Sequence, residues 1–338
     1  MTRRMHTKGS GFRQALFLWL ALTSTTLFAQ PNRFTFQRGL MGTQFKVILY
    51  AQDSLTAHHA YQAVSARMDT LNQIMSDYLD GSEINRLSAS GGSGQWVPVS
   101  RELFDVLTKA VTIARISGGR YDPTIGPLSL LWRRAVRRNQ FPSASERKKA
   151  RKSVGYQHLE FDAARQAIRL NRPNMRLDVG GIGQGFAIDE ALLVIKPFPV
   201  QAALLDIGGD ILAYNAPPQQ SGWRIDVGSG KTGDTDTLTV NLRNAAITTS
   251  GDTYRFLNYK GRRYSHIMNP RSGLGLRHFV RATVKAPEGY QADALTKVFS
   301  VAGWRKSRRL LHRFPGAELY IIENKGGKIR SWQSSGFR

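Results

Sequence analysis

The segment 176–189, RLDVGGIGQGFAID, combines an acidic residue with an unusual density of glycine. Asp178 is followed by glycines at 180, 181, 183 and 185, and glycine lets the backbone turn tightly and approach a ligand closely. An apolar run follows, so the segment is predicted to open a helix whose first N–H groups can face an anionic or polar ligand. The spacing is not the G-x-G-x-x-G of dinucleotide-binding turns. Close packing of a strand on a helix would also explain these glycines, and both interpretations stay open.

An aromatic residue lies in a loop upstream of this turn. In the segment 117–132, SGGRYDPTIGPLSLLW, Tyr121 precedes Asp122 and Pro123, with glycines before them and a second proline-containing turn after them. An aromatic ring beside Asp-Pro in a rigid loop could form the wall of a pocket for a planar ligand. The same dipeptide is also common in purely structural turns.

Two further segments carry side chains suited to acid–base or metal chemistry. His266 lies on a short predicted strand that enters the turn NPRSG, and functional residues concentrate in such loops, although a histidine there can also be structural. Asp293 stands at the start of a predicted helix in QADALTKVF, 291–299. A carboxylate at that position is either an N-terminal cap or a ligand for a hard cation such as Mg²⁺.

The segment GSGKT at 228–232 resembles the end of a phosphate-binding loop, but this chemistry is not expected there. The first glycine of that motif would fall at Ile225, and a polar turn follows in place of a helix. A hairpin turn explains the segment.

Hydrophobic periodicity predicts the helices and strands that carry these residues. Alternation predicts strands, and apolar residues at helical spacing predict amphipathic helices. Strands and helices are interspersed without regular alternation, which favours an α+β fold over a doubly wound parallel sheet. The predicted strands include 44–52, two in 158–179 and a final hairpin in 317–332, and the predicted helices include 56–78, 100–119 and two in succession in 290–314.

The N-terminal segment has the pattern of a secretory signal. Residues 1–14 are basic, an apolar run ends near Ala29, and that run is short for a membrane span. We therefore expect residues 1–29 to be a signal peptide, with an uncleaved anchor as the alternative, and residues 30–338 to form one domain. The 41% hydrophobic composition is typical of a globular protein, and the absence of cysteine excludes a disulfide framework.

The net charge of +24 is concentrated in two stretches, 133–153 and 304–313. Such a surface attracts anions, whether nucleic acid, anionic lipid or a phosphate-bearing ligand. A nucleic-acid partner is not expected for an exported chain, and a solvated basic surface is the simplest explanation. Peripheral association with an anionic membrane is compatible with the same charge.

Together and in order, these segments resemble the FAD:protein FMN transferase family (the ApbE type). The resemblance extends from about Met41 to Gly303 and depends on several spaced motifs: MGTQF at 41–45, IMSDYLDGSEINRLS at 74–88, GGRYDPTIGPL at 118–128, LDVGGIGQGFAID at 177–189, LLDIGGDI at 204–211, TTSGDTYRF at 248–256, YSHIMNPRSG at 264–273 and ADALTKVFSVAG at 292–303.

The resemblance implies an α+β domain related to the tunnelling fold, with FAD as substrate and Mg²⁺ at its pyrophosphate. It implies transfer of FMN to a threonine or serine hydroxyl of an exported or membrane-bound flavoprotein, with release of AMP, and a periplasmic location that includes association with the inner membrane. His266 would assist removal of the acceptor proton. The metal would be held by Gly181, Asp293 and Thr296, with Asp293 also essential for catalysis. The FAD site would comprise Met41, Tyr78, Tyr121, Asp122, Pro123, Asp178 and Gln184.

One departure from the family pattern concerns the metal site. The family often has threonine four residues after the aspartate, whereas this chain has Lys297 there and Thr296 one residue earlier. Successive helical residues point about 100° apart, so Thr296 does not simply substitute. Three hypotheses follow: a flavin transferase, a non-catalytic FAD-binding or delivery protein with a degraded metal site, or a protein that binds polyanions or membranes through its basic patches. An inserted Thr253 in SGDTY is a smaller departure.

Overall fold

The computed structural model describes residues 1–2, 30–228, 237–251 and 256–337. The chain divides into two units, Met1–Gln30 and Pro31–Arg338, and the fold described below is that of the second. The predicted signal peptide, most of the GSGKT turn and Thr253 lie outside the described residues. In the part of the chain that is described, no helix is long and apolar enough to span a bilayer.

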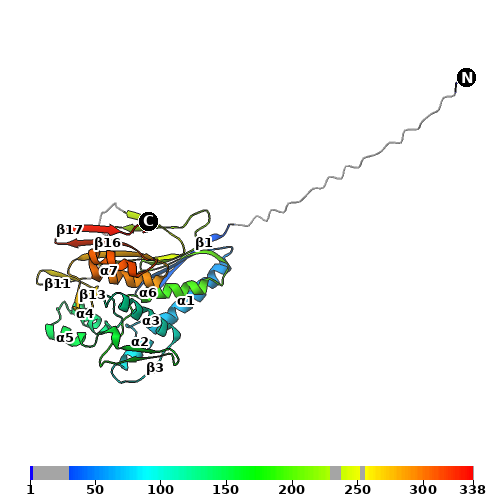
Figure 1. Ribbon diagram of the computed structural model, residues 1–338. Coiled ribbons are helices and arrows are strands. Elements are labelled where there is room, and N and C mark those ends of the chain that lie inside the picture. Colours follow the sequence, from blue (N-terminus) through cyan, green and yellow to red (C-terminus); the bar gives the residue numbers. More distant parts are fainter. Residues whose placement is uncertain (3–29, 229–236, 252–255, 338) are drawn as a thin grey trace. The chain divides into compact units, whose positions relative to one another are not determined.

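Within the described residues of the second unit, eight strands form one large sheet in which every neighbouring pair is antiparallel (Figure 1). This confirms the predicted α+β class. The order across the sheet is β1 (Asn32–Leu40), β2 (Thr43–Ala51), β6 (Val200–Ile207), β7 (Asp210–Tyr214), β10 (Ala245–Gly251), β15 (Phe279–Ala286), β16 (Glu318–Lys325) and β17 (Lys328–Gln333).

Three long helices cover one face of this sheet: α1 (Ser54–Met75), α6 (Gly183–Ile195) and α7 (Gly289–Leu310). The Asp53 side chain caps α1 by accepting a hydrogen bond from the backbone N–H of Thr56 at 2.7 Å. The apolar residues of α1 recur at helical spacing and are almost fully buried: Ala57, Ala60, Val64, Met68, Leu71 and Met75. Helix α7 bends at Gly303, whose φ is 71°, in agreement with the two successive helices predicted for this region.

Both faces of the sheet are covered, as the alternation along β2 shows. Val47 and Leu49 belong to the core beneath the helices, whereas Ile48 joins a second apolar cluster on the opposite face. That second cluster includes Trp223 and Val240 from the hairpin of β8 (Trp223–Gly228) and β9 (Thr237–Leu242).

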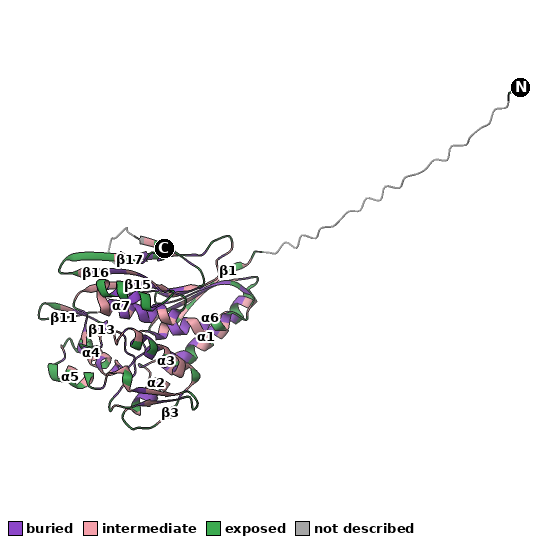
Figure 2. Cartoon of the chain, in the orientation of Figure 1, coloured by how far each residue is buried: buried purple, intermediate pink, exposed green. Residues whose placement is uncertain are grey.

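A smaller layer lies beyond the three helices. It contains α2 (Glu83–Ala89), α3 (Arg101–Ile116), α4 (Gly126–Arg138), α5 (Ala144–Arg151), the 3-10 turn Tyr156–His158, and a three-stranded sheet of β3 (Val97–Pro98), β5 (Ala167–Leu170) and β4 (Leu159–Asp162). Helix α5 has no buried residue, and Figure 2 colours it as exposed and intermediate. The side chains of Ser82 and Ser100 cap α2 and α3, and the cap at Ser100 agrees with the start of the helix predicted over 100–119.

The prediction of a rigid loop over 117–132 is correct only as far as Ile125, after which α4 begins. Proline is tolerated in the first turn of a helix because its missing N–H would have no helical partner there, so Pro127 starts α4 instead of marking a turn. Two short hairpins cover α4: β11 (Phe256–Tyr259) with β12 (Arg262–Ser265), and β13 (Met268–Asn269) with β14 (Leu274–Gly275).

Candidate active site

The close crossing of α6 and α7 sets the geometry of the site. A Cβ atom on Gly185 would lie 2.2 Å from the carbonyl oxygen of Gly289, and one on Gly289 would lie 2.4 Å from the carbonyl oxygen of Gly185. Only glycine at both positions allows this approach. Asp189 of α6 then caps α7 by accepting hydrogen bonds from the N–H groups of Gly289 (2.6 Å) and Tyr290 (2.8 Å). Burial raises the pKa of Asp189 to about 7.

Asp293 lies one turn into α7, at this crossing, and is 1% exposed. One of its carboxylate oxygens accepts a hydrogen bond from the backbone N–H of Gly185 at 3.2 Å. The other forms an ion pair with the ammonium group of Lys297, four residues further along the helix. The predicted metal-binding carboxylate is therefore buried and paired at both oxygens.

A second acidic side chain, Asp210 at the start of β7, adds to the field around Lys297. Burial, reinforced by the nearby Asp293 carboxylate, raises the pKa of Asp210 to about 8. Burial alone would lower the pKa of Lys297, but the carboxylates of Asp293 and Asp210 outweigh it and raise that pKa. The turn before Asp210 packs on the β1–β2 turn, since a Cβ atom on Gly208 would lie 2.8 Å from the hydroxyl of Thr43.

The Tyr121 loop supplies the aromatic side of the site. Tyr121 is buried, and a Cβ atom on Gly181 would lie 3.3 Å from the edge of its ring. Burial raises the pKa of Tyr121 well above its usual value, and the carboxylates of Asp178 and Asp293 add to this shift. Among the described residues its hydroxyl has no hydrogen-bond partner, and buried hydroxyls are normally satisfied by protein, water or ligand.

Asp122 and Pro123 hold the loop in place. The Asp122 carboxylate accepts hydrogen bonds from the N–H and hydroxyl of Thr124 (2.9 and 2.6 Å) and from the N–H of Tyr156 (3.1 Å). The carbonyl oxygen of Pro123 accepts a hydrogen bond from the N–H of Asp178 at 2.8 Å, which joins this loop to the glycine-rich turn. The sequence pattern predicted both residues as direct contacts of FAD, and the structure gives the Asp122 side chain a structural partner on each oxygen.

Arg133 of α4 is a site residue that the sequence pattern did not single out. Its guanidinium donates to the carboxylates of Asp77 (2.6 Å) and Asp178 (3.2 Å), and its Cζ lies 4.0 Å from the centre of the Tyr78 ring. Burial and the Asp178 carboxylate raise the pKa of Asp77, against the pull of Arg133. Three of the four residues in this group therefore come from motifs of the resemblance, and the fourth comes from the basic stretch 133–153. In the sequence, the only indication of Arg133 is the high density of arginine in this stretch.

Removing the charge of Arg133 is expected to destabilise the fold. We expect Arg133→Met to lower the free energy of unfolding by about 2 kcal/mol, because it takes the ion-pair partner from two largely buried carboxylates. Arg134→Met is the matched control, since the neighbouring Arg134 pairs with Glu146 at the exposed surface and its loss should not be measurable. Urea unfolding of both variants checks the difference, and equal effects would contradict the assigned role of Arg133.

The remaining predicted residues differ in their exposure and in the elements that carry them. His266 is exposed and follows β12, Gln184 is half-buried in the first turn of α6, and Tyr78 is 73% exposed. Met41 occupies the β1–β2 turn with a φ of 47°, and it lines an open hollow with its neighbours in that turn and with Asp69 and Asn72 of α1. Packing and hydrogen bonds thus join Tyr121, Gly181, Asp178, Asp293 and Lys297.

The residues predicted to hold Mg²⁺ do not fit a divalent cation as they are arranged. The ammonium of Lys297 stands at the Asp293 carboxylate and would repel a second cation. The hydroxyl of Thr296 donates to the backbone carbonyl of Asp293 at 2.7 Å, so it points along its own helix. In the described part of the chain, no cluster of three or more His, Cys, Asp and Glu side chains could bind a metal ion.

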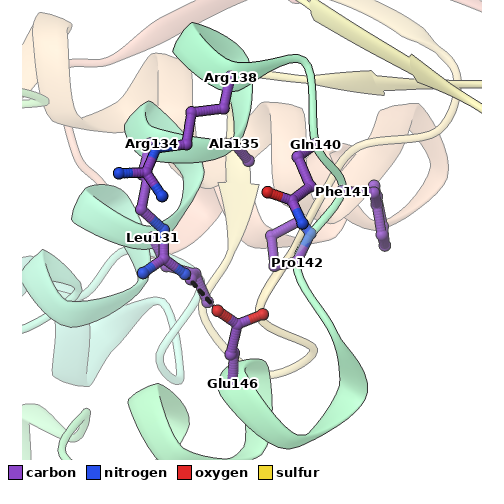
Figure 3. A pocket seen from close by; sticks show the side chains of 8 residues that line it. All are labelled: Leu131, Arg134, Ala135, Arg138, Gln140, Phe141, Pro142 and Glu146. Carbon is purple, nitrogen blue, oxygen red and sulfur yellow. Dashed lines mark hydrogen bonds and ion pairs between the residues drawn. The ribbon is translucent and has the colours of Figure 1, made fainter.

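A hollow of about 220 Å³ lies elsewhere, between α4 and α5 (Figure 3). It is lined mainly by Arg134, Arg138, Gln140, Phe141 and Glu146, and an ion pair joins Arg134 to Glu146. None of the predicted site residues faces it, so it is not the site described above.

Comparison with known proteins decides the family. The ApbE family model matches residues 41–321. The chain belongs to the ApbE family. The FAD:protein FMN transferase of Treponema pallidum is 29% identical over 303 residues, 85% of this chain and 83% of that protein. That of Salmonella typhimurium is 26% identical over 321 residues, 93% of this chain and 91% of that protein.

Solved structures agree with this assignment. The apo form of the flavinyl transferase ApbE from Pseudomonas stutzeri matches with a TM-score of 0.81 at 25% identity, over 92% of this chain and 97% of that one. The ApbE protein of Thermotoga maritima matches with a TM-score of 0.79 at 26% identity, over 90% and 98%. The ApbE-type fold and family predicted from the ordered motifs are confirmed.

Proposed function

We propose that this ApbE family protein is an FAD:protein FMN transferase, which moves FMN from FAD to a threonine or serine hydroxyl of an acceptor flavoprotein. The observation that carries the proposal is the junction of Tyr121, Gly181 and Asp293 at the N-terminal end of α6. Backbone N–H groups and the dipole at a helix N-terminus favour an anion such as a pyrophosphate. The curated relatives bear the name of this activity.

In this reaction the acceptor oxygen attacks the phosphorus on the FMN side of the pyrophosphate. The new P–O bond forms as the bond to AMP breaks, and the electron pair leaves with AMP. The hydroxyl proton passes to a base, a role that we assign to the exposed His266. Phosphoryl transfer depends mostly on positioning and charge neutralisation, which the helix terminus and the neighbouring cation provide.

Divalent magnesium is implied by the family resemblance, but the proposed reaction does not use it, because the ammonium group of Lys297 already pairs with Asp293.

The Tyr78 ring, with Arg133 against it, is suited to stack on a planar flavin. Export to the periplasm by the segment 1–29 and an acceptor in a membrane redox system belong to the same proposal.

The same ion pair favours a second candidate, a protein that binds or delivers FAD without transfer. Incubation of the purified protein with FAD and an acceptor flavoprotein separates the two. Transfer predicts flavin fluorescence that stays on the acceptor after denaturation, disappears with a Thr→Ala acceptor and is not produced from free FMN. Bound FAD without covalent flavin on the acceptor would contradict the transferase and support the delivery protein.

A further inference from the structure

We propose that the ammonium group of Lys297 is the resident cation of this site, so that FAD binds through its pyrophosphate without a divalent ion. The inference rests on the proposed function in one respect only, the identity of the ligand. It assigns to Lys297 a binding role, and it predicts which variant would acquire a requirement for metal.

The first support is the pairing of Asp293. This carboxylate is 1% exposed, and a buried carboxylate needs a positive charge or several donors beside it. The N–H of Gly185 occupies one oxygen, and the ammonium of Lys297 occupies the other. The site therefore already contains the positive charge that its acidic residue requires.

The second support is the position of the lysine side chain. Its aliphatic part lies over the glycine-rich turn, since a Cβ atom on Gly181 would lie 3.4 Å from Cγ and 3.5 Å from Cε of Lys297. The side chain is nevertheless 25% exposed. An ammonium group has three donors, and its ion pair with Asp293 uses one of them. The ammonium can thus hold Asp293 and still donate to an anion that approaches the N-terminal turn of α6.

The third support comes from the other polar groups on α7 and β7. The hydroxyls of Thr296 and Ser300 donate to backbone carbonyls of their own helix, at 2.7 Å each. Asp210 is buried at the start of the neighbouring strand β7. A divalent ion at Asp293 would have to displace the ammonium and recruit these oxygens from their present partners.

The test measures FAD binding to the full chain by flavin fluorescence, once with a chelator and once with Mg²⁺. We expect the wild-type dissociation constant to differ by less than about threefold between the two conditions, because its cation is built in. In the chelator, Lys297→Thr and Lys297→Met should each bind FAD at least about tenfold more weakly. Mg²⁺ should restore Lys297→Thr, which leaves a hydroxyl one turn from a free Asp293 carboxylate.

Two further measurements make the result decisive. Electron paramagnetic resonance with Mn²⁺ reports ion binding directly, and we expect Mn²⁺ to bind to Lys297→Thr but not to the wild type. Lys109→Thr removes a lysine from another i,i+4 pair, with Asp105 on α3, and should behave as the wild type. Thermal melting checks that each variant is folded, and Lys297→Met keeps the aliphatic packing over Gly181 if Lys297→Thr does not fold.

Three results would overturn the inference. If Mg²⁺ strengthens wild-type FAD binding about tenfold or more, the cation at the pyrophosphate is the metal ion and not the lysine. If Lys297→Met binds FAD as tightly as the wild type in the chelator, Lys297 does not contribute to FAD binding. Failure of the wild type to bind FAD under either condition would overturn the proposed function as well, which distinguishes the two failures.

Discussion

Alanine in place of His266 is expected to slow FMN transfer about 10²- to 10⁴-fold, the usual contribution of a general base. The affinity for FAD should stay within about threefold, because the imidazole is assigned to the acceptor proton and not to the flavin. The backbone around it is held independently of its side chain. The N–H of Ser265 donates a hydrogen bond to the carbonyl oxygen of Leu276 at 2.8 Å, and the hydroxyl of Ser265 accepts one from the N–H of Ile267 at 3.0 Å.

Single-turnover transfer at saturating FAD, followed over pH, is the measurement that checks this role. The acid limb of the wild-type profile should disappear in His266→Ala, since that limb reports protonation of the base. His312→Ala removes another exposed histidine, in the 3-10 turn after α7, and should leave both the rate and the profile unchanged. If His266→Ala loses affinity for FAD and keeps its rate at saturation, the base role is wrong.

Periodicity and capping were sufficient to predict most of the framework. The helix that opens after the glycine-rich turn begins at Gly183 and ends at Ile195, before Pro197, as the sequence predicts. Helix α4 was not predicted, because Pro127 and four arginines obscure an apolar face whose members are few. Its buried residues, Leu128 and Trp132 among them, pack on the hairpins of β11–β14, and that partner is not visible locally.

In the candidate site, too, contacts between residues close in the sequence could be predicted, and contacts between residues far apart in the sequence could not. The pairing of Asp293 with Lys297 follows from their spacing on one helix, since residues four apart share a face. The hydrogen bond from Gly185 to Asp293 joins positions 108 apart in the chain and could not be predicted from spacing. Arg133 is a similar case, because its partners Asp77 and Asp178 lie 56 and 45 residues away. Motifs indicated the acids and local spacing indicated Lys297, but only the fold shows that Arg133 neutralises Asp77 and Asp178.

The structure confirms the packing interpretation of the glycine-rich turn at Gly185, and the ligand-binding interpretation stays a prediction. Gly185 is required for close packing, since a Cβ atom there would meet the backbone of α7. Gly181 instead faces Tyr121 and Lys297, the side chains assigned to the ligand. In the proposed function one motif would serve both purposes, and the packing glycine determines where Asp293 and Lys297 of α7 lie.

Gly185→Ala is accordingly expected to lower the free energy of unfolding by about 3 kcal/mol, the upper part of the range for an overpacked core. Its Cβ would lie 2.2 Å from the carbonyl oxygen of Gly289 and 2.8 Å from Cβ of Asp293, and neither the backbone nor a helical Cβ can move without displacing α7. Urea unfolding gives the loss of stability. Titration with FAD should show weaker binding in the same variant, because Asp293 and Lys297 move with α7.

Gly183→Ala is the matched control two residues earlier in the same helix. Its Cβ would meet only Cγ2 of Val179 at 3.7 Å, an ordinary contact, and alanine has the better helix propensity. We therefore expect Gly183→Ala to be neutral or to stabilise the protein by up to about 1 kcal/mol, with FAD binding unchanged. Similar losses in both variants would mean that the glycines serve the flexibility of the turn as a whole. A loss confined to Gly185→Ala would show that the crossing of α6 and α7 holds the acidic residue and its lysine in place.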